Sequence, residues 1–242
     1  PLLERAFAER ERELSAVRAI LDDVRRRGDE AVLDCEKKFD ATELTKENFR
    51  VSEKEFEDAY RAVSPELLAS LKKAIRNILE YHSRTGRKDN VVTKDGRTTG
   101  YVVRPVSSAG IYAPGGTAPL SSSVLMGVLP AKAAGVERIV LATPAKGGVI
   151  APLTLVAAKE CGVTEVYKMG GAQAVAALAY GTQSVKKVDV IAGPGNIYVT
   201  LAKKEVYGEV GIDMLAGPSE IMIVADESAN PIYVAADMLS QA

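Results

Sequence analysis

The sequence has 242 residues, of which 47% are hydrophobic and 26% are charged, an ordinary composition for a globular protein of one large or two average domains. Because 31 basic residues nearly balance 32 acidic ones, the net charge of −1 gives no indication of nucleic acid, membrane or anionic partners.

The segment from residue 1 to about residue 85 is expected to be helical and highly charged. Ser64 followed by Pro65 predicts the N-cap and first position of a helix, and the Ser52-x-x-Glu55 pattern predicts a capping box. Apolar residues recur at helical spacing along one stripe, formed by Leu68, Leu71, Ile75, Ile78 and Leu79.

The next segment, residues 86–100 (GRKDNVVTKDGRTTG), is rich in turn residues and is predicted to form a hairpin or a connector. From Tyr101 onward charged residues become sparse, and Gly, Ala, Val and Ile dominate. Short apolar strands alternate there with Ala- and Leu-rich helices. The strands are expected at 138–143, 165–169 and 188–192, and the helices near 120–134, 151–161, 172–180 and 197–207.

Each of these helices ends at a glycine, a residue that accepts the left-handed conformation that closes a helix. The glycines are Gly135, Gly162, Gly181 and Gly208. Strand–helix–strand repetition with short loops indicates parallel strands joined by right-handed crossovers. The predicted fold class is therefore α/β with a Rossmann-like parallel sheet, followed by a further strand at 220–225 and a helix from about Pro231.

Four loops rich in Gly and Pro follow predicted strands, at 113–116 (APGG), 170–173 (GGAQ), 193–196 (GPGN) and 217–220 (GPSE). In parallel α/β sheets, ligands bind at the carboxyl ends of strands, where helix N-termini offer free N–H groups. One such loop is ordinary in any α/β protein, but four, two of them carrying the amides Gln173 and Asn196, favour a nucleotide or another polar ligand. The GxGxxG fingerprint is absent, so the pattern alone does not name NAD.

Five blocks of the sequence closely resemble the histidinol dehydrogenase family in order and spacing. They are 110–125 (GIYAPGGTAPLSSSVL), 170–181 (GGAQAVAALAYG), 193–199 (GPGNIYV), 212–220 (IDMLAGPSE) and 237–242 (DMLSQA). The resemblance is strong over about residues 101–242 and diffuse before them. It implies an aldehyde-dehydrogenase-like superfold. Its parts would be a helical segment of a discontinuous domain at 1–106, an NAD-binding Rossmann-like domain at 107–218, and a return to the first domain at 219–242.

The resemblance also implies roles for five residues. Tyr112, Gln173 and Asn196 fall where the family contacts NAD, and a hydroxyl with two amides can hold ribose, phosphate or carboxamide without adding charge. Ser219 and Gln241 fall where the family binds its substrate, and Gln241 is also where the family supplies an oxygen ligand to zinc.

The activity implied by the resemblance is that of a histidine-biosynthesis oxidoreductase. The family oxidises L-histidinol through L-histidinaldehyde to L-histidine with two NAD and a zinc ion, as a homodimer whose C-terminal tails complete the partner's site. The positions that correspond to the family's catalytic bases and remaining zinc ligands lie beyond Ala242, so no catalytic residue is expected in this sequence. Because the sequence contains one histidine, His82, we expect this chain alone to be inactive.

The sequence has no CxxC pair, no apolar signal core and no long apolar run. These absences indicate a reduced, cytoplasmic location.

Simpler interpretations of the same residues stay open. Tyr112 could be a packing aromatic of a strand, Asn196 only an N-cap, and Gln241 a surface residue of a helix. The pair Lys203-Lys204 is interpreted as a solvated helix face.

Two other functions also stay open. An aldehyde-dehydrogenase-like enzyme would need a reactive cysteine near the nicotinamide, whereas Cys161, just before a helix-ending glycine, is interpreted as a packing residue. The second alternative is a nucleotide-binding fragment without catalytic activity.

Overall fold

The computed structural model describes residues 11–115, 120–163, 165–215 and 221–240. Its centre is a sheet of five parallel strands in the order β5-β4-β3-β6-β7. The strands are β3 (Ser108–Tyr112), β4 (Arg138–Thr143), β5 (Glu165–Lys168), β6 (Val190–Ala192) and β7 (Gly211–Ile212). The predicted α/β class with a Rossmann-like parallel sheet is thereby confirmed.

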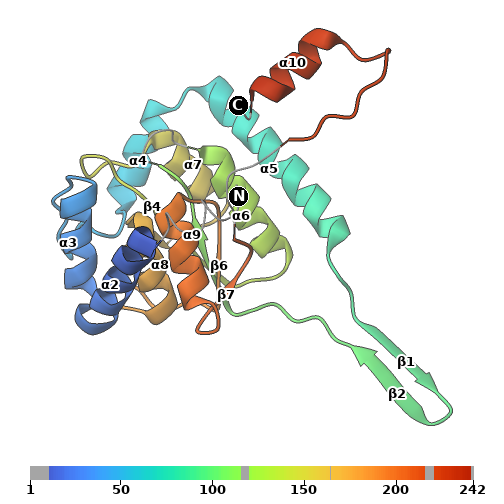
Figure 1. Cartoon of the computed structure of the whole chain (residues 1–242), viewed down its shortest axis with the longest axis horizontal. Helices are drawn as coiled ribbons and strands as arrows, with labels where there is room; N and C mark the ends of the chain where they lie inside the picture. The colour runs from blue at the N-terminus through green and yellow to red at the C-terminus, as the bar shows by residue number, and fades with distance from the viewer. Residues whose placement is uncertain (1–10, 116–119, 164, 216–220, 241–242) are drawn as a thin grey trace.

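Helices cover both faces of the sheet (Figure 1). On one face lie α6 and α7, and on the other lie α8 and α9, with the bounds α6 (Ser121–Ala133), α7 (Pro152–Glu160), α8 (Gly171–Tyr180) and α9 (Ile197–Val206). Because successive side chains of a strand point to opposite faces, the neighbours Ile111 and Tyr112 belong to different hydrophobic clusters. The core therefore consists of two apolar layers, one on each side of β3.

The N-terminal helices form an outer layer on the same sheet. Their bounds are α2 (Glu11–Arg27), α3 (Asp29–Phe39), α4 (Glu53–Ala62) and α5 (Pro65–Thr85). α2 and α3 pack against the α8 and α9 side, while α4 contacts α7 and α5 contacts α6. The capping box at Ser52 and Glu55 and the Ser64 cap are present as predicted. The division of the chain at residues 106 and 218 stays a prediction.

Two segments lie apart from this layered body (Figure 1). The predicted hairpin is formed by β1 (Asn90–Lys94) and β2 (Arg97–Tyr101), and all its strand residues are exposed. Its turn residues Asp95 and Gly96 have φ values of 49° and 71°, the conformation that two-residue hairpin turns require. The helix expected from Pro231 is α10 (Pro231–Leu239), which buries none of its residues in the described part of the chain.

The strand predicted at 220–225 is wrong for the part that the structure describes, because residues 221–226 form no strand. Met222 and Val224 are highly exposed, and no described strand pairs with this segment. An apolar β-branched run becomes a strand only when a partner accepts its backbone hydrogen bonds. No helix in the described ranges is long and apolar enough to cross a membrane.

Candidate functional site

The order of the strands places a topological switch point between β3 and β6. From β3 the chain proceeds through β4 to β5 on one side, and then crosses back to β6 and β7 on the other. The loops that follow β3 and β6 therefore diverge to opposite sides of the sheet. Open α/β sheets bind their ligands in the crevice outside the carboxyl ends of two such strands.

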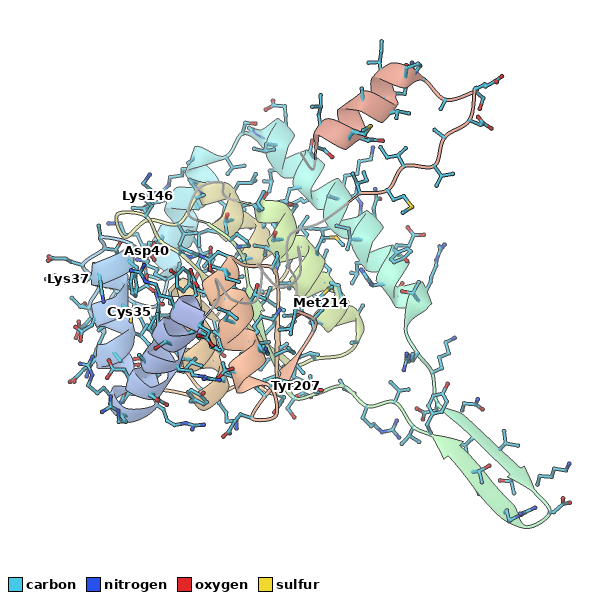
Figure 2. The ribbon with its side chains drawn as sticks, viewed as in Figure 1. Cys35, Lys37, Asp40, Lys146, Tyr207 and Met214 are labelled. Atoms are coloured by element: carbon cyan, nitrogen blue, oxygen red, sulfur yellow. The ribbon has the colours of Figure 1, made fainter. Side chains whose placement is uncertain are left out.

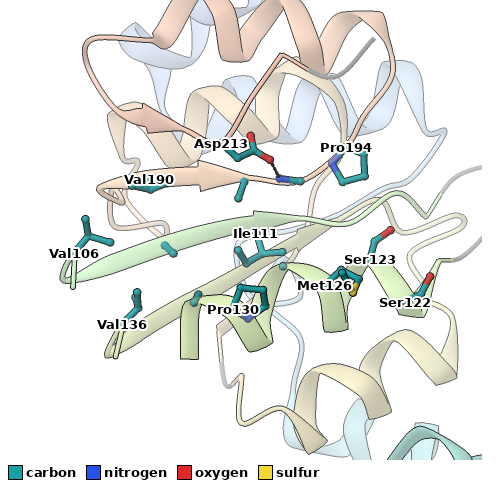
Figure 3. A pocket seen from close by; sticks show the side chains of 15 residues that line it. Val106, Ile111, Ser122, Ser123, Met126, Pro130, Val136, Val190, Pro194 and Asp213 are labelled. Atoms are coloured by element: carbon teal, nitrogen blue, oxygen red, sulfur yellow. Dashed lines mark hydrogen bonds between the residues drawn. The ribbon is translucent and has the colours of Figure 1, made fainter. Parts of the chain in front are cut away.

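A groove with a volume of about 490 Å³ runs along this junction. Figure 3 shows it between α6 and the strands β3 and β6, with Ser122, Ser123 and Pro194 at one end and Val106 and Val136 at the other. Its walls are mostly apolar. α6 lies close to β3 because Gly127 has no side chain, and a Cβ there would lie 2.5 Å from Ile111 Cγ2.

The turn after β6 starts with a glycine that no other residue can replace without strain. Gly193 has a φ of 127°, and a Cβ at this position would lie 2.0 Å from the backbone oxygen of Tyr112. Its N–H donates to Asp213 Oδ2 over 2.9 Å, and its carbonyl accepts from Lys203 Nζ over 3.0 Å. Lys203 and Asp213 also form an ion pair with each other. The turn is thus fixed from both sides.

The interpretation of Lys203 as a solvated residue is wrong, because its exposed fraction is only 2%. Helical periodicity explains this burial, because Lys203 lies four residues after the buried Val199 and three before the buried Val206, on the same face of α9. The neighbouring Lys204 is exposed, as expected.

Asn196 is the N-cap of α9. Its Oδ1 accepts hydrogen bonds from the N–H groups of Tyr198 and Val199, both over 3.1 Å. The interpretation as an N-cap is therefore confirmed. The side chain is exposed, and its Nδ2 group is not needed for capping, so a contact of this donor with a ligand remains compatible with the cap.

Tyr112 and Gln173 meet at a second turn, the one that follows β5. The Tyr112 hydroxyl accepts a hydrogen bond from Gly171 N–H over 3.2 Å, and its exposed fraction is 4%. Burial raises the pKa of Tyr112 to about 12, so the hydroxyl keeps its proton at neutral pH. The packing interpretation of Tyr112 is thus correct for its ring, while its O–H remains a donor.

Gln173 lies in the first turn of α8 and is 2% exposed. Its Nε2 donates to Glu36 Oε1 over 2.9 Å, and the N–H of Gly170 donates to the same oxygen, also over 2.9 Å. Tyr112 and Gln173 therefore share the turn at residues 170–171. Asn196 lies on the other loop, three residues after the glycine that touches the Tyr112 backbone.

Glu36 is a site residue that sequence reasoning missed. It comes from α3, is completely buried, and its Oε2 has no hydrogen-bond partner among the described residues. Burial is the main reason that its pKa rises to about 8, and the nearby carboxylate of Asp40, at the end of α3 (Figure 2), adds to the rise. The sequence signal that could have indicated its burial is the i,i+4 spacing of Glu36 from the apolar Val32, which places both residues on one face of the helix.

The remaining predicted residues have different outcomes. Ser219, Gln241 and Ala242 lie outside the described residues. The ligand roles of Ser219 and Gln241 therefore stay predictions, and so does the place of the catalytic bases beyond Ala242. His82 is half-buried in the last turn of α5, with its ring edge-to-face against Tyr81. The described part holds no group of three or more His, Cys, Asp or Glu side chains that could bind a metal ion.

Neither cysteine has the properties of a nucleophile. Cys161 is buried beside the end of α7, and Cys35 is half-buried on α3. Burial raises the pKa of each thiol to about 11, so the reactive thiolate is scarce at neutral pH. The packing interpretation of Cys161 is confirmed, which argues against a cysteine-dependent aldehyde-dehydrogenase-like mechanism.

A family model described as histidinol dehydrogenase matches residues 3–242. The histidinol dehydrogenase of Heliobacterium mobile is 56% identical to this chain over 93% of its residues. That of Bacillus subtilis (strain 168) is 53% identical over 96% of its residues. These alignments cover 53% and 54% of the two relatives, so the chain spans about half the length of the curated relatives it matches. The crystal structure of histidinol dehydrogenase from Elizabethkingia anophelis superposes with a TM-score of 0.88 and 42% identity, over 94% of this chain and 53% of that one.

Proposed function

Because this chain belongs to the histidinol dehydrogenase family, we propose that the whole protein is an oxidoreductase of histidine biosynthesis. The proposed reaction is the NAD-dependent oxidation of L-histidinol through L-histidinaldehyde to L-histidine. NAD would supply the hydride acceptor in both steps. The part played by this half of the protein would be to bind and orient the nucleotide.

The observation that supports this role is that two side chains at the switch point keep hydrogen-bond donors for a ligand. After their internal hydrogen bonds are made, Tyr112 keeps a hydroxyl proton and Asn196 keeps its Nδ2 donor. The positive end of the α9 dipole adds a preference for phosphate. Together these groups fit a ligand with neutral hydroxyl or amide groups and a pyrophosphate.

Zinc binding and the substrate contacts of Ser219 and Gln241 stay predictions. Gln241 would give one neutral oxygen, whereas a zinc site needs at least three protein ligands. The described part supplies no such set, so the other ligands would have to come from other residues of the protein. The homodimer with exchanged tails and the cytoplasmic location also stay predictions.

The test is NADH formation by a protein of the relatives' full length with L-histidinol as substrate. Two NADH should form for each L-histidinol consumed, and alanine replacements of Cys35 and Cys161 should leave turnover intact. Absence of NADH, or loss of turnover in the Cys161→Ala variant, would contradict the proposal. The 242-residue chain, whose one imidazole lies on α5, should form no measurable NADH in the same assay.

A further inference from the structure

Glu36 reaches the turn after β5 from a separate layer of the molecule. It lies on α3, which packs against α8, and its side chain has no exposed surface. One carboxyl oxygen, Oε1, accepts two hydrogen bonds, from Gly170 N–H and from Gln173 Nε2. A buried carboxyl group is unfavourable in an apolar layer, so its presence here calls for a reason other than packing.

The two bonds decide which end of the Gln173 amide faces away from Glu36. Since Glu36 Oε1 already accepts from a backbone N–H, it is an acceptor, and only the NH₂ group of Gln173 can bind it. The carbonyl oxygen of Gln173 must then point elsewhere. It lies beside Gly171, 2.7 Å from the position that a Cβ would occupy there. The hydrogen bonds of this turn join Gly170 and Gln173 to Glu36 and Gly171 to Tyr112, and none of them uses that oxygen.

We propose that Glu36 is a positioning residue of the nucleotide site, which holds Gln173 so that its carbonyl oxygen faces the ligand. The inference rests on the proposed nucleotide binding and specifies which kind of ligand group contacts Gln173. The ligand must present an N–H or O–H donor to Gln173, such as a ribose hydroxyl or a carboxamide NH₂. A ligand group that only accepts hydrogen bonds, such as a phosphate oxygen, is excluded from this contact.

The test is a double-mutant cycle on NAD affinity, measured by calorimetry with the 242-residue chain. Glu36→Met removes the acceptor at similar length, and Gln173→Met removes the amide. Each should weaken NAD binding roughly tenfold, the effect of about one lost hydrogen bond. Because Glu36 acts through Gln173, the double variant should bind about as weakly as either single variant. The control Glu30→Met, on the exposed side of α3, should bind like the wild type.

Two isosteric variants guard against a Glu36→Met variant that does not fold. Glu36→Gln keeps a carbonyl acceptor and should bind NAD within about threefold of the wild type. Gln173→Glu should bind roughly tenfold more weakly, because it has no NH₂ for Glu36. Thermal unfolding of every variant separates loss of fold from loss of binding.

The outcomes distinguish the two proposals. Multiplicative losses in the cycle, wild-type affinity in Glu36→Met, or wild-type affinity in Gln173→Glu would overturn the role of Glu36 while nucleotide binding stands. A wild-type chain that does not bind NAD would instead overturn nucleotide binding by this half of the protein, and the positioning role with it.

Discussion

Lys203 and Asp213 form an ion pair that holds both backbone polar groups of Gly193. The lysine donates to the carbonyl and the aspartate accepts from the N–H. The conformation of the turn after β6 therefore depends on one side chain from α9 and one from the residue that follows β7. The lysine is buried, while the aspartate is about one-third exposed and lines the groove. The pair therefore connects the turn at Gly193 with the last turn of α9 and with the residue that follows β7.

Replacing Lys203 by Met should destabilise the fold by about 2–3 kcal/mol, because Asp213 and the Gly193 carbonyl lose their partner. The partial exposure of Asp213 keeps the expected value below that of a fully buried pair. The measurement is urea unfolding, with the exposed neighbour Lys204→Met as the matched control. Equal stability of the two variants would contradict the importance of the pair.

Gly193→Ala should abolish NAD binding and destabilise the chain, because its Cβ would collide with the Tyr112 backbone. Gly147→Ala is the control, since Gly147 also has a positive φ but meets nothing within 4 Å. The control should lose only about 1 kcal/mol and bind NAD normally. A calorimetric titration of both variants checks this. Normal NAD binding by Gly193→Ala would show that the turn is not part of the site.

Asn196→Asp should separate capping from ligand contact. Aspartate is as good an N-cap as asparagine, so the midpoint of thermal unfolding should hardly change. The variant lacks the Nδ2 donor, and NAD binding should weaken roughly tenfold. Asn196→Ala should lose both the cap, about 1 kcal/mol of stability, and the affinity. If Asn196→Asp binds NAD like the wild type, this residue serves only as a cap.

Much of the α/β part follows from its sequence, because local signals and global fold agree there. The bounds of α6 to α9 lie within one or two residues of those predicted. The glycines expected to close them, such as Gly135 and Gly162, have positive φ values of 85° and 84°. β7 was missed, because two residues at a sheet edge are too short to show a period.

The site was harder to predict than the fold, since its supporting contacts join residues far apart in the chain. Glu36 and Gln173 are 137 residues apart, so neither indicates the other in the sequence. Lys203 stands next to the exposed Lys204 in the sequence, and the pair by itself does not show that Lys203 binds the Gly193 carbonyl. The family resemblance supplied Tyr112, Gln173 and Asn196, but not the groups that orient them.

The stability of the chain should depend on the titration of Glu36. Its folded-state pKa of about 8 lies above the ordinary value of 4.5, so the folded state binds the proton more tightly than the unfolded state. Stability from this group is therefore complete below about pH 4.5 and is lost progressively as the pH rises toward about 8. Glu36→Gln does not titrate, so its stability relative to the wild type should increase by about 4 kcal/mol between those limits.

Urea unfolding of the wild type and Glu36→Gln at a series of pH values measures that difference. Glu36→Met, which also lacks the ionisable group, should show the same trend with pH. A constant difference between wild type and Glu36→Gln would mean that Glu36 ionises in the folded state as it does in the unfolded one.

The central claim, that this half of the protein binds NAD at the switch point of its sheet, is tested most directly by titrating the ¹⁵N-labelled chain with NAD and mapping the amide shifts. Saturable shifts are predicted in the three turns at 113–115, 170–173 and 193–199, with the hairpin at 90–101 unaffected. The absence of saturable shifts, or shifts confined to residues outside these turns, would contradict the account.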